Sequence, residues 1–300
     1  MDNEIDYPEA GGPAWGKIVI EQYLIRNWYF SSAEEPSLQR QRLVQAFLEM
    51  DEIPDTWDDF KDPPPRLPTE EEINTILRPW RSDEYLRIIA SQMFEEDNIP
   101  VLLRTYYNPE DDGKINKWTA DQNLFERNDT WTRLDDPEFF NFGPDWRRIY
   151  DILPEVAGPM NHPLRRSVAE EHIKSFQEQF KNFLSSWKQK HPEEWSTDPE
   201  KFIENCALRL QTIFVKSMLL IADQEAFQTG NAWLLFLDGQ RNIIREGRVN
   251  LNKKGIDDIA MDYDQTSEIP EELNVGEKYR LNGEIGKDLY RLTDEDLADP

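Results

Sequence analysis

Residues 169–187 read AEEHIKSFQEQFKNFLSSW, and this stretch decides the fold class that the sequence predicts. Its apolar side chains recur at intervals of four, three, four, three and four residues, at Ala169, Ile173, Phe176, Phe180, Phe183 and Trp187. Because an α-helix has about 3.6 residues per turn, this spacing places them on one stripe of a long helix. Ser167 with Glu170 predicts a capping box at the start of this helix. The proline of His191-Pro192 predicts its end.

A second helix is predicted after Asp198-Pro199, because Asp is a good N-cap residue and Pro suits the first helical position. Its apolar positions are Phe202, Cys206, Leu210, Phe214, Met218 and Ile221. The opposite face is also apolar, with Ile203, Leu219 and Leu220, which is typical of a buried helix. We therefore expect the two helices to form an antiparallel pair at the centre of the fold.

Shorter helices are predicted in the N-terminal third of the chain. Apolar spacing favours helices within residues 18–30 and 38–50. Thr69 with Glu72 predicts a capping box, and Ser82 predicts the start of a further helix. The five prolines of residues 53–68 fix the backbone and remove donors, so this segment should be an extended connector.

A β-hairpin is predicted at Asp238-Gly239, which separates the apolar run 233–237 from the apolar residues that begin at Ile243. The predicted fold class is therefore mainly α, an irregular helical domain with a central antiparallel helix pair and a small C-terminal β-hairpin. Four segments are expected: a flexible N-terminal arm (1–13), an acidic, largely helical and loop-rich region (14–162), a charge-balanced helix pair plus β-hairpin (163–250), and an acidic, partly extended C-terminal segment (251–300).

The net charge of −26 arises from 60 acidic and 34 basic side chains. It argues against direct nucleic-acid binding, which depends on Lys and Arg at phosphates. The charge is unevenly spread, because residues 163–250 hold 12 acids and 12 bases while residues 1–162 hold 34 acids and 16 bases. Residues 251–300 hold 14 acids and six bases. Distinct acidic faces beside a balanced scaffold are therefore expected.

The compartment predicted from the sequence is the cytoplasm or the nucleus. Cys206 is the single cysteine, and a secreted chain of this length more often carries several. The acidic start of the sequence lacks the basic and apolar regions of a secretory signal. The longest apolar stretch, residues 213–222, is too short for a membrane span, so no membrane association is expected.

Several chemical motifs are incomplete. Asp58-Asp59-Phe60-Lys61-Asp62 has the letters of a diphosphate–magnesium motif, which needs a helix, but three prolines follow it directly. Residues 108–113 resemble half of an EF-hand loop, but Thr119 stands where the bidentate Glu belongs. The three histidines, His162, His172 and His191, are too scattered for a zinc site, and Cys206 lies in a buried pattern. No catalytic residue, metal site or cofactor is therefore predicted.

The function predicted from the sequence is that of a non-enzymatic interaction protein, such as an escort, assembly factor or regulator. Its acidic surfaces would bind a basic protein or an Arg/Lys-rich peptide, with partly exposed Trp rings beside carboxylates. The predicted partner-binding residues are Trp57, Asp58, Asp59, Asp62, Glu70, Glu71, Trp118 and Trp131. Two alternatives stay open: an enzyme whose carboxylates meet His162 or His172 only in the fold, and an acidic nucleic-acid mimic. The oligomeric state is not indicated.

Overall fold

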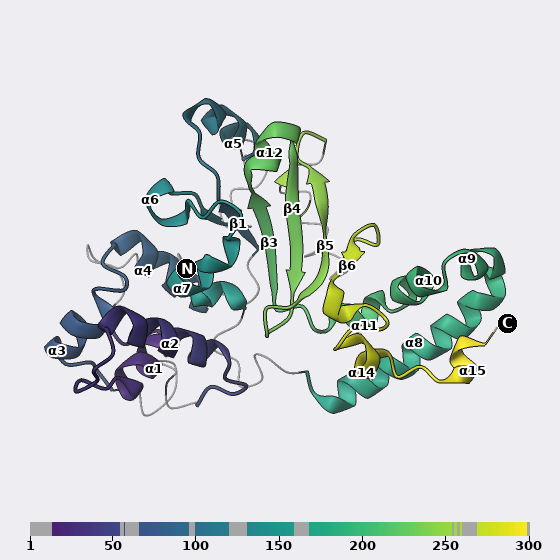
Figure 1. Ribbon diagram of the computed structural model, residues 1–300, viewed down its shortest axis with the longest axis horizontal. Helices are drawn as coiled ribbons and strands as arrows, with labels where there is room; N and C mark the ends of the chain where they lie inside the picture. Colours follow the sequence, from purple (N-terminus) through teal and green to yellow (C-terminus); the bar gives the residue numbers. More distant parts are fainter. Residues whose placement is uncertain are drawn as a thin grey trace, which may run out of the picture. The chain divides into compact units, whose positions relative to one another are not determined.

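The computed structural model divides the chain into two compact units, which are described separately (Figure 1). Unit 1 comprises residues 1–98 and 147–165, and unit 2 comprises residues 99–146 and 166–300. The structure describes residues 14–54, 57, 66–95, 100–119, 131–158, 168–253, 255–256, 259 and 269–298. None of the helices in these ranges is both long and apolar enough to cross a membrane.

Unit 1 is built from short helices, one of which begins at a capping box made by neighbouring residues. Its elements are α1 (Val19–Asn27), α2 (Pro36–Leu48), α3 (Glu70–Glu72), the π-helical turn η2 (Ile73–Leu77), α4 (Glu84–Glu95), α7 (Ile149–Ile152) and the 3₁₀ turn η6 (Pro154–Ala157). The two helices predicted near the N-terminus are confirmed as α1 and α2. The capping box is confirmed as well, because the Glu72 amide donates to the Thr69 hydroxyl and the Thr69 amide donates to the Glu72 carboxylate.

Two other predictions in this unit concern the start of α4 and the proline-rich connector. The start of α4 is marked by Asp83, whose carboxylate accepts from the Tyr85 amide, rather than by Ser82. Of the predicted extended connector, residues 55–56 and 58–65 lie outside the described residues. The core of the unit is formed by the apolar faces of α1 and α2, on which Val19, Leu24 and Phe47 are fully buried.

Unit 2 contains a six-stranded mixed sheet with the order β2-β1-β3-β4-β5-β6. The strands are β1 (Val101–Arg104), β2 (Thr132–Leu134), β3 (Ser217–Ala222), β4 (Asn231–Leu237), β5 (Ile243–Asn250) and β6 (Asn274–Val275). Strand β1 is parallel to both of its neighbours, whereas β3 to β6 are antiparallel in sequence order. Figure 1 shows β3, β4 and β5 as the long strands at the centre of this sheet.

The mainly α fold with a small C-terminal hairpin is therefore wrong, although the hairpin itself is correct as β4–β5. The predicted second helix ends early, as α10 (Pro199–Cys206) and α11 (Leu208–Thr212), and residues 217–222 form β3 instead. All six residues of β3 are buried. A strand that is buried on both faces lacks alternation, so its apolar residues also fitted the helical spacing that began at Phe202.

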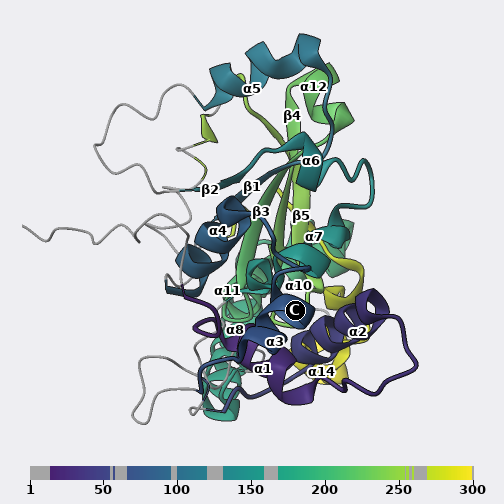
Figure 2. The same ribbon diagram turned by 90° about the vertical axis from the view of Figure 1, so that its left-hand side faces the viewer.

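The remaining elements of unit 2 are helices and short helical turns. They are η3 (Pro109–Asp111), α5 (Asp112–Trp118), α6 (Pro137–Phe140), α8 (Glu170–Lys190), α9 (Pro192–Thr197), α12 (Gln224–Thr229), η7 (Glu277–Tyr279), α14 (Gly286–Tyr290) and α15 (Asp294–Leu297), while η5 (Trp146–Arg148) spans the boundary between the units. In both views α5 and α12 lie at one end of the strands, and α8 and α11 lie toward the other end (Figures 1 and 2).

The long helix predicted from residues 169–187 is confirmed as α8, but its buried face is narrower than the predicted stripe. Phe180 and Leu184 are buried, whereas Phe183 is 48% exposed and Trp187 is half-buried. The helix begins after Ala169, which makes no capping hydrogen bond through its side chain. Ser167, which was expected to cap it, lies outside the described residues. The aromatic residues at the edge of α8 are thus left partly accessible.

Candidate functional site

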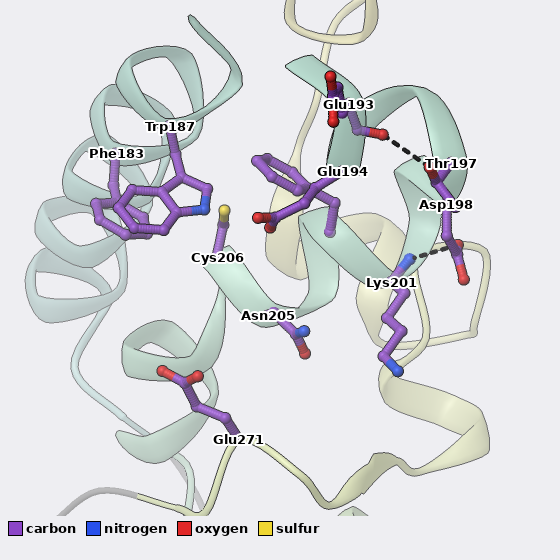
Figure 3. Close-up of a pocket in the computed structure, with 11 residues that line it drawn as sticks. Phe183, Trp187, Glu193, Glu194, Thr197, Asp198, Lys201, Asn205, Cys206 and Glu271 are labelled. Atoms are coloured by element: carbon purple, nitrogen blue, oxygen red, sulfur yellow. Dashed lines mark hydrogen bonds between the residues drawn. The ribbon is translucent and has the colours of Figure 1, made fainter. Parts of the chain in front are cut away.

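A groove in unit 2 has an aromatic wall and an acidic rim (Figure 3). Its volume is about 570 Å³, and α8, α9, α10 and the residue Glu271 contribute to it. We call it the acidic groove and define it by the six side chains that characterise it: Phe183, Trp187, Glu193, Glu194, Asp198 and Glu271. Volumes of this order are typical of ligand pockets, so the groove has room for one or two side chains of a partner.

The aromatic wall follows from the spacing of four residues on α8. Phe183 and Trp187 lie one turn apart, and their rings stack with centroids 5.3 Å apart and an interplanar angle of 22°. His191, which ends the helix, stacks on Trp187 in turn at 4.0 Å. Figure 3 shows both aromatic side chains of the wall on the same side of the groove. The exposed half of Phe183 is therefore an accessible ring surface.

The carboxylates come from the helix starts that follow this wall. Glu193 and Glu194 occupy the first turn of α9, where acidic side chains are favoured by the helix dipole. The Asp198 carboxylate accepts from the Lys201 amide at 3.0 Å and caps α10, as the sequence predicted. Among the eleven residues that line the groove, Lys201 is the one Lys or Arg against four carboxylates. The groove therefore has a negative potential.

Cys206 lies at the floor of the acidic groove and is sensitive to this potential. Burial, together with the smaller effect of the Glu194 and Glu271 carboxylates, raises the pKa of its thiol to about 12. In Figure 3 the Glu194 carboxylate is directed toward Trp187 and Cys206. A thiol with this pKa stays protonated near neutral pH, so Cys206 is a poor nucleophile and a poor metal ligand.

A second hollow, of about 450 Å³, lies where β1 and β2 end in unit 2. The guanidinium of Arg104 is buried there and donates to Asp112 at 2.7 Å and to Asp135 at 3.4 Å. Arg133 also pairs with Asp135, at 2.6 Å. Two arginines therefore balance two aspartates, and this hollow has no charge excess that would select a partner.

The predicted partner-binding residues are distributed over both units. Asp58, Asp59 and Asp62 lie outside the described residues. Trp57 is half-buried in unit 1, where its ring contacts Tyr23 at 5.8 Å. Glu70 and Glu71 are exposed in the first turn of α3, also in unit 1, while Trp118 and Trp131 belong to unit 2.

The expectation that Trp118 and Trp131 are partly exposed is wrong. Their exposed fractions are 7% and 8%, and both belong to the hydrophobic core of unit 2. Trp118 stacks on Phe227 with centroids 5.2 Å apart and donates to Asn252 at 3.3 Å. Polar neighbours in the sequence did not predict exposure, because segments far along the chain cover these rings. Their burial leaves little of either ring for a partner.

The EF-hand-like stretch and the histidines of the sequence do not form a metal site among the described residues. Asp111 pairs with Lys114 of α5 at 2.8 Å and Asp112 pairs with Arg104 of β1, so these two carboxylates of the EF-hand-like stretch are bound to basic side chains. His172 is exposed on α8, and His162 lies outside the described residues. Within the part of the chain that the structure describes, no group of three or more His, Cys, Asp and Glu side chains is arranged to hold a metal ion.

Sequence reasoning missed the residues of the acidic groove. The available signal was the pair Glu193-Glu194, which closely follows Trp187 and the His191-Pro192 stop at the end of α8. His191 connects the two parts, because its ring stacks on Trp187 and its Nδ1 lies 3.0 Å from the Glu194 carboxylate. Comparisons with protein-family models, curated protein sequences and solved structures find no match for this chain. The groove is therefore interpreted from its own geometry.

Proposed function

We propose that this protein is a non-enzymatic interaction protein, an escort, assembly factor or regulator, which binds a basic segment of a partner protein in the acidic groove. The observation that carries the proposal is the combination of an accessible aromatic wall with four carboxylates and a single ammonium group in one hollow. Carboxylates attract Lys and Arg side chains, and an aromatic ring accepts the same cations on its face.

The electrostatic contribution acts mainly on selectivity and on the rate of association. Complementary potentials steer an oppositely charged partner, and this steering weakens as the Debye length falls from about 10 Å at 0.1 M salt to about 3 Å at 1 M. The carboxylates of the groove are exposed, so each ion pair with the partner should contribute only about 0.5 kcal/mol. The net acidic charge of the whole chain adds attraction at longer range.

The acidic stretch around Asp58, Asp59 and Asp62, together with Glu70 and Glu71, is proposed as a secondary contributor to this attraction. These residues add negative charge to the chain. The proposed compartment is the cytosol or the nucleus, because the single thiol, Cys206, is buried and unpaired by a disulfide.

The test is fluorescence anisotropy with a labelled nine-residue peptide rich in Arg and Lys, titrated with the full chain. Replacing Glu193, Glu194 and Glu271 with Gln should weaken binding roughly tenfold, which corresponds to the loss of three exposed ion pairs. A matched control replaces three exposed carboxylates of α8, at Glu170, Glu171 and Glu178, and removes the same charge.

The control variant should bind nearly as the natural chain does. Equal losses for both triple variants would mean that net charge alone attracts the peptide and that the groove is not the site. Absence of binding by the natural chain at 50 mM salt would refute the proposed function itself.

A further inference from the structure

Unit 2 already contains a site in which an arginine is held by an aromatic ring and two carboxylates. The Arg248 guanidinium lies over the Trp233 ring, 5.6 Å from its centroid. Its nitrogens donate to both oxygens of Asp223, at 2.8 and 2.7 Å, and approach Glu225 at 3.0 Å. This arrangement uses the planar shape of the guanidinium, which stacks and donates in its own plane at the same time.

The same combination recurs around Arg104. Its guanidinium lies 4.5 Å from the Tyr107 ring centroid and 5.0 Å from the Phe227 centroid. Its nitrogens donate to Asp112 and Asp135. At two separate places in this chain, an arginine is therefore held by an aromatic ring and two carboxylates, once on the surface and once in a buried position.

The acidic groove has these components without an arginine among its lining residues. Phe183 and Trp187 supply the rings, and four carboxylates line the same groove, of which Glu194 also contacts His191 Nδ1 at 3.0 Å. In Figure 3 Lys201 extends on the side of the groove away from the aromatic wall. Lys201 is the one cationic side chain among the eleven residues that line the groove, and it does not extend toward the rings.

We infer that the occupant of the acidic groove is an arginine side chain of the partner, which packs against the accessible ring of Phe183 and pairs with carboxylates of the groove. This inference rests on the proposed function and specifies its ligand. A guanidinium is favoured over an ammonium because it is flat, more weakly hydrated and able to donate to two carboxylates while it stacks. A lysine would retain the ion pairs and lose the stacking geometry.

The experiment compares three labelled peptides of equal charge in the anisotropy assay: Gly-Arg-Gly-Arg-Gly-Arg-Gly, the same peptide with Lys for each Arg, and the same peptide with asymmetrically dimethylated Arg. The Arg peptide should bind at least fivefold more tightly than the Lys peptide. The dimethylated peptide should lose affinity relative to unmodified Arg, because methylation keeps the charge and blocks donors to the carboxylates. Equal affinity for Arg and Lys peptides would overturn the arginine assignment while the proposed function stands, whereas failure of all three peptides to bind would overturn both.

A substitution in the aromatic wall gives an independent test. Phe183→Leu keeps an apolar side chain and removes the ring, so the preference for Arg over Lys should fall to less than twofold while Lys-peptide affinity changes little. Phe30→Leu is the matched control, because Phe30 is a similarly exposed ring, at 51%, in unit 1. An unchanged preference in Phe183→Leu would show that the ring does not contact the ligand and would overturn the stacking geometry.

Discussion

Glu21 on α1 is a buried carboxyl group whose protonation should set the stability of unit 1. Its exposed fraction is 1%, and its carboxylate accepts from the Gly16 amide at 2.6 Å. Burial raises its pKa from 4.5 to about 7, and the nearby Glu155 acts in the same direction. Arg81 and Arg87 lower the pKa but do not compensate for the burial. Arg81 is itself buried and paired with Glu155 at 2.6 Å.

The sign of the pH dependence follows from proton binding. Between pH 4.5 and about 7 the folded state holds a proton on Glu21 that the unfolded state has lost, so the free energy of unfolding falls as the pH rises through this window. Below this window Glu21 does not change the free energy of unfolding, because it is protonated in both the folded and the unfolded state. Above it the charged form is fully penalised, by roughly 3 kcal/mol, since each pKa unit corresponds to about 1.4 kcal/mol.

Glu21→Gln should remove this penalty, because the amide has a similar shape and its oxygen still accepts from Gly16. Urea unfolding of the natural chain and the variant at pH 5, 6, 7 and 8 measures the difference in unfolding free energy. The variant should gain about 2–3 kcal/mol relative to the natural chain between pH 5 and pH 8. Other titrating groups cancel in this difference, as does any constant packing effect of Gln.

Glu71→Gln is the control, because Glu71 is an exposed carboxylate of the same unit. The difference in unfolding free energy between Glu71→Gln and the natural chain should stay nearly constant with pH. The reasoning is refuted if the Glu21→Gln difference is equally flat, since Glu21 would then be charged in the folded state at pH 5 as it is at pH 8.

Two further predictions concern unit 2. Phe180→Ala should lower the free energy of unfolding by about 3–5 kcal/mol in urea titration, because this ring is 3% exposed, whereas Phe183→Ala should cost less than about 1 kcal/mol; similar losses would contradict the assigned orientation of α8. Cys206 should react with iodoacetamide at pH 8 at least tenfold more slowly in the folded chain than in 8 M urea, because its folded pKa is about 12; mass spectrometry follows the modification, and equal rates would show an accessible thiolate.

The sequence correctly predicted the features that depend on contacts between residues close together in the chain. The Thr69 hydroxyl and the Glu72 amide are three residues apart, and Asp198 caps the turn that directly follows it. Asp238-Gly239 likewise joins two strands that are adjacent in the chain. Such contacts close short loops, so their geometry depends on local backbone preferences more than on the rest of the fold.

The parallel part of the sheet was decided by tertiary structure. Val101 pairs with Thr132 on one side and with Leu219 on the other, across separations that no local pattern encodes. The short buried strand β1 shows no alternation, and the apolar residues of β3 continued a helical spacing. Pairing between distant segments therefore decided that residues 217–222 form a strand.

The acidic groove was hidden for a related reason. Residues 163–250 carry equal numbers of acids and bases, so a count along the sequence indicated a neutral scaffold. In the fold Lys188 and Arg248 are bound by other groups, because Lys188 donates to the backbone of α15 and Arg248 pairs with Asp223, and Lys201 is the one base among the residues that line the groove. Glu271 joins from a later segment of the chain. The sequence by itself determined the local helix starts, the β4–β5 hairpin and the total charge, whereas folding determined which charges share one surface, because electrostatic potential depends on distance in space.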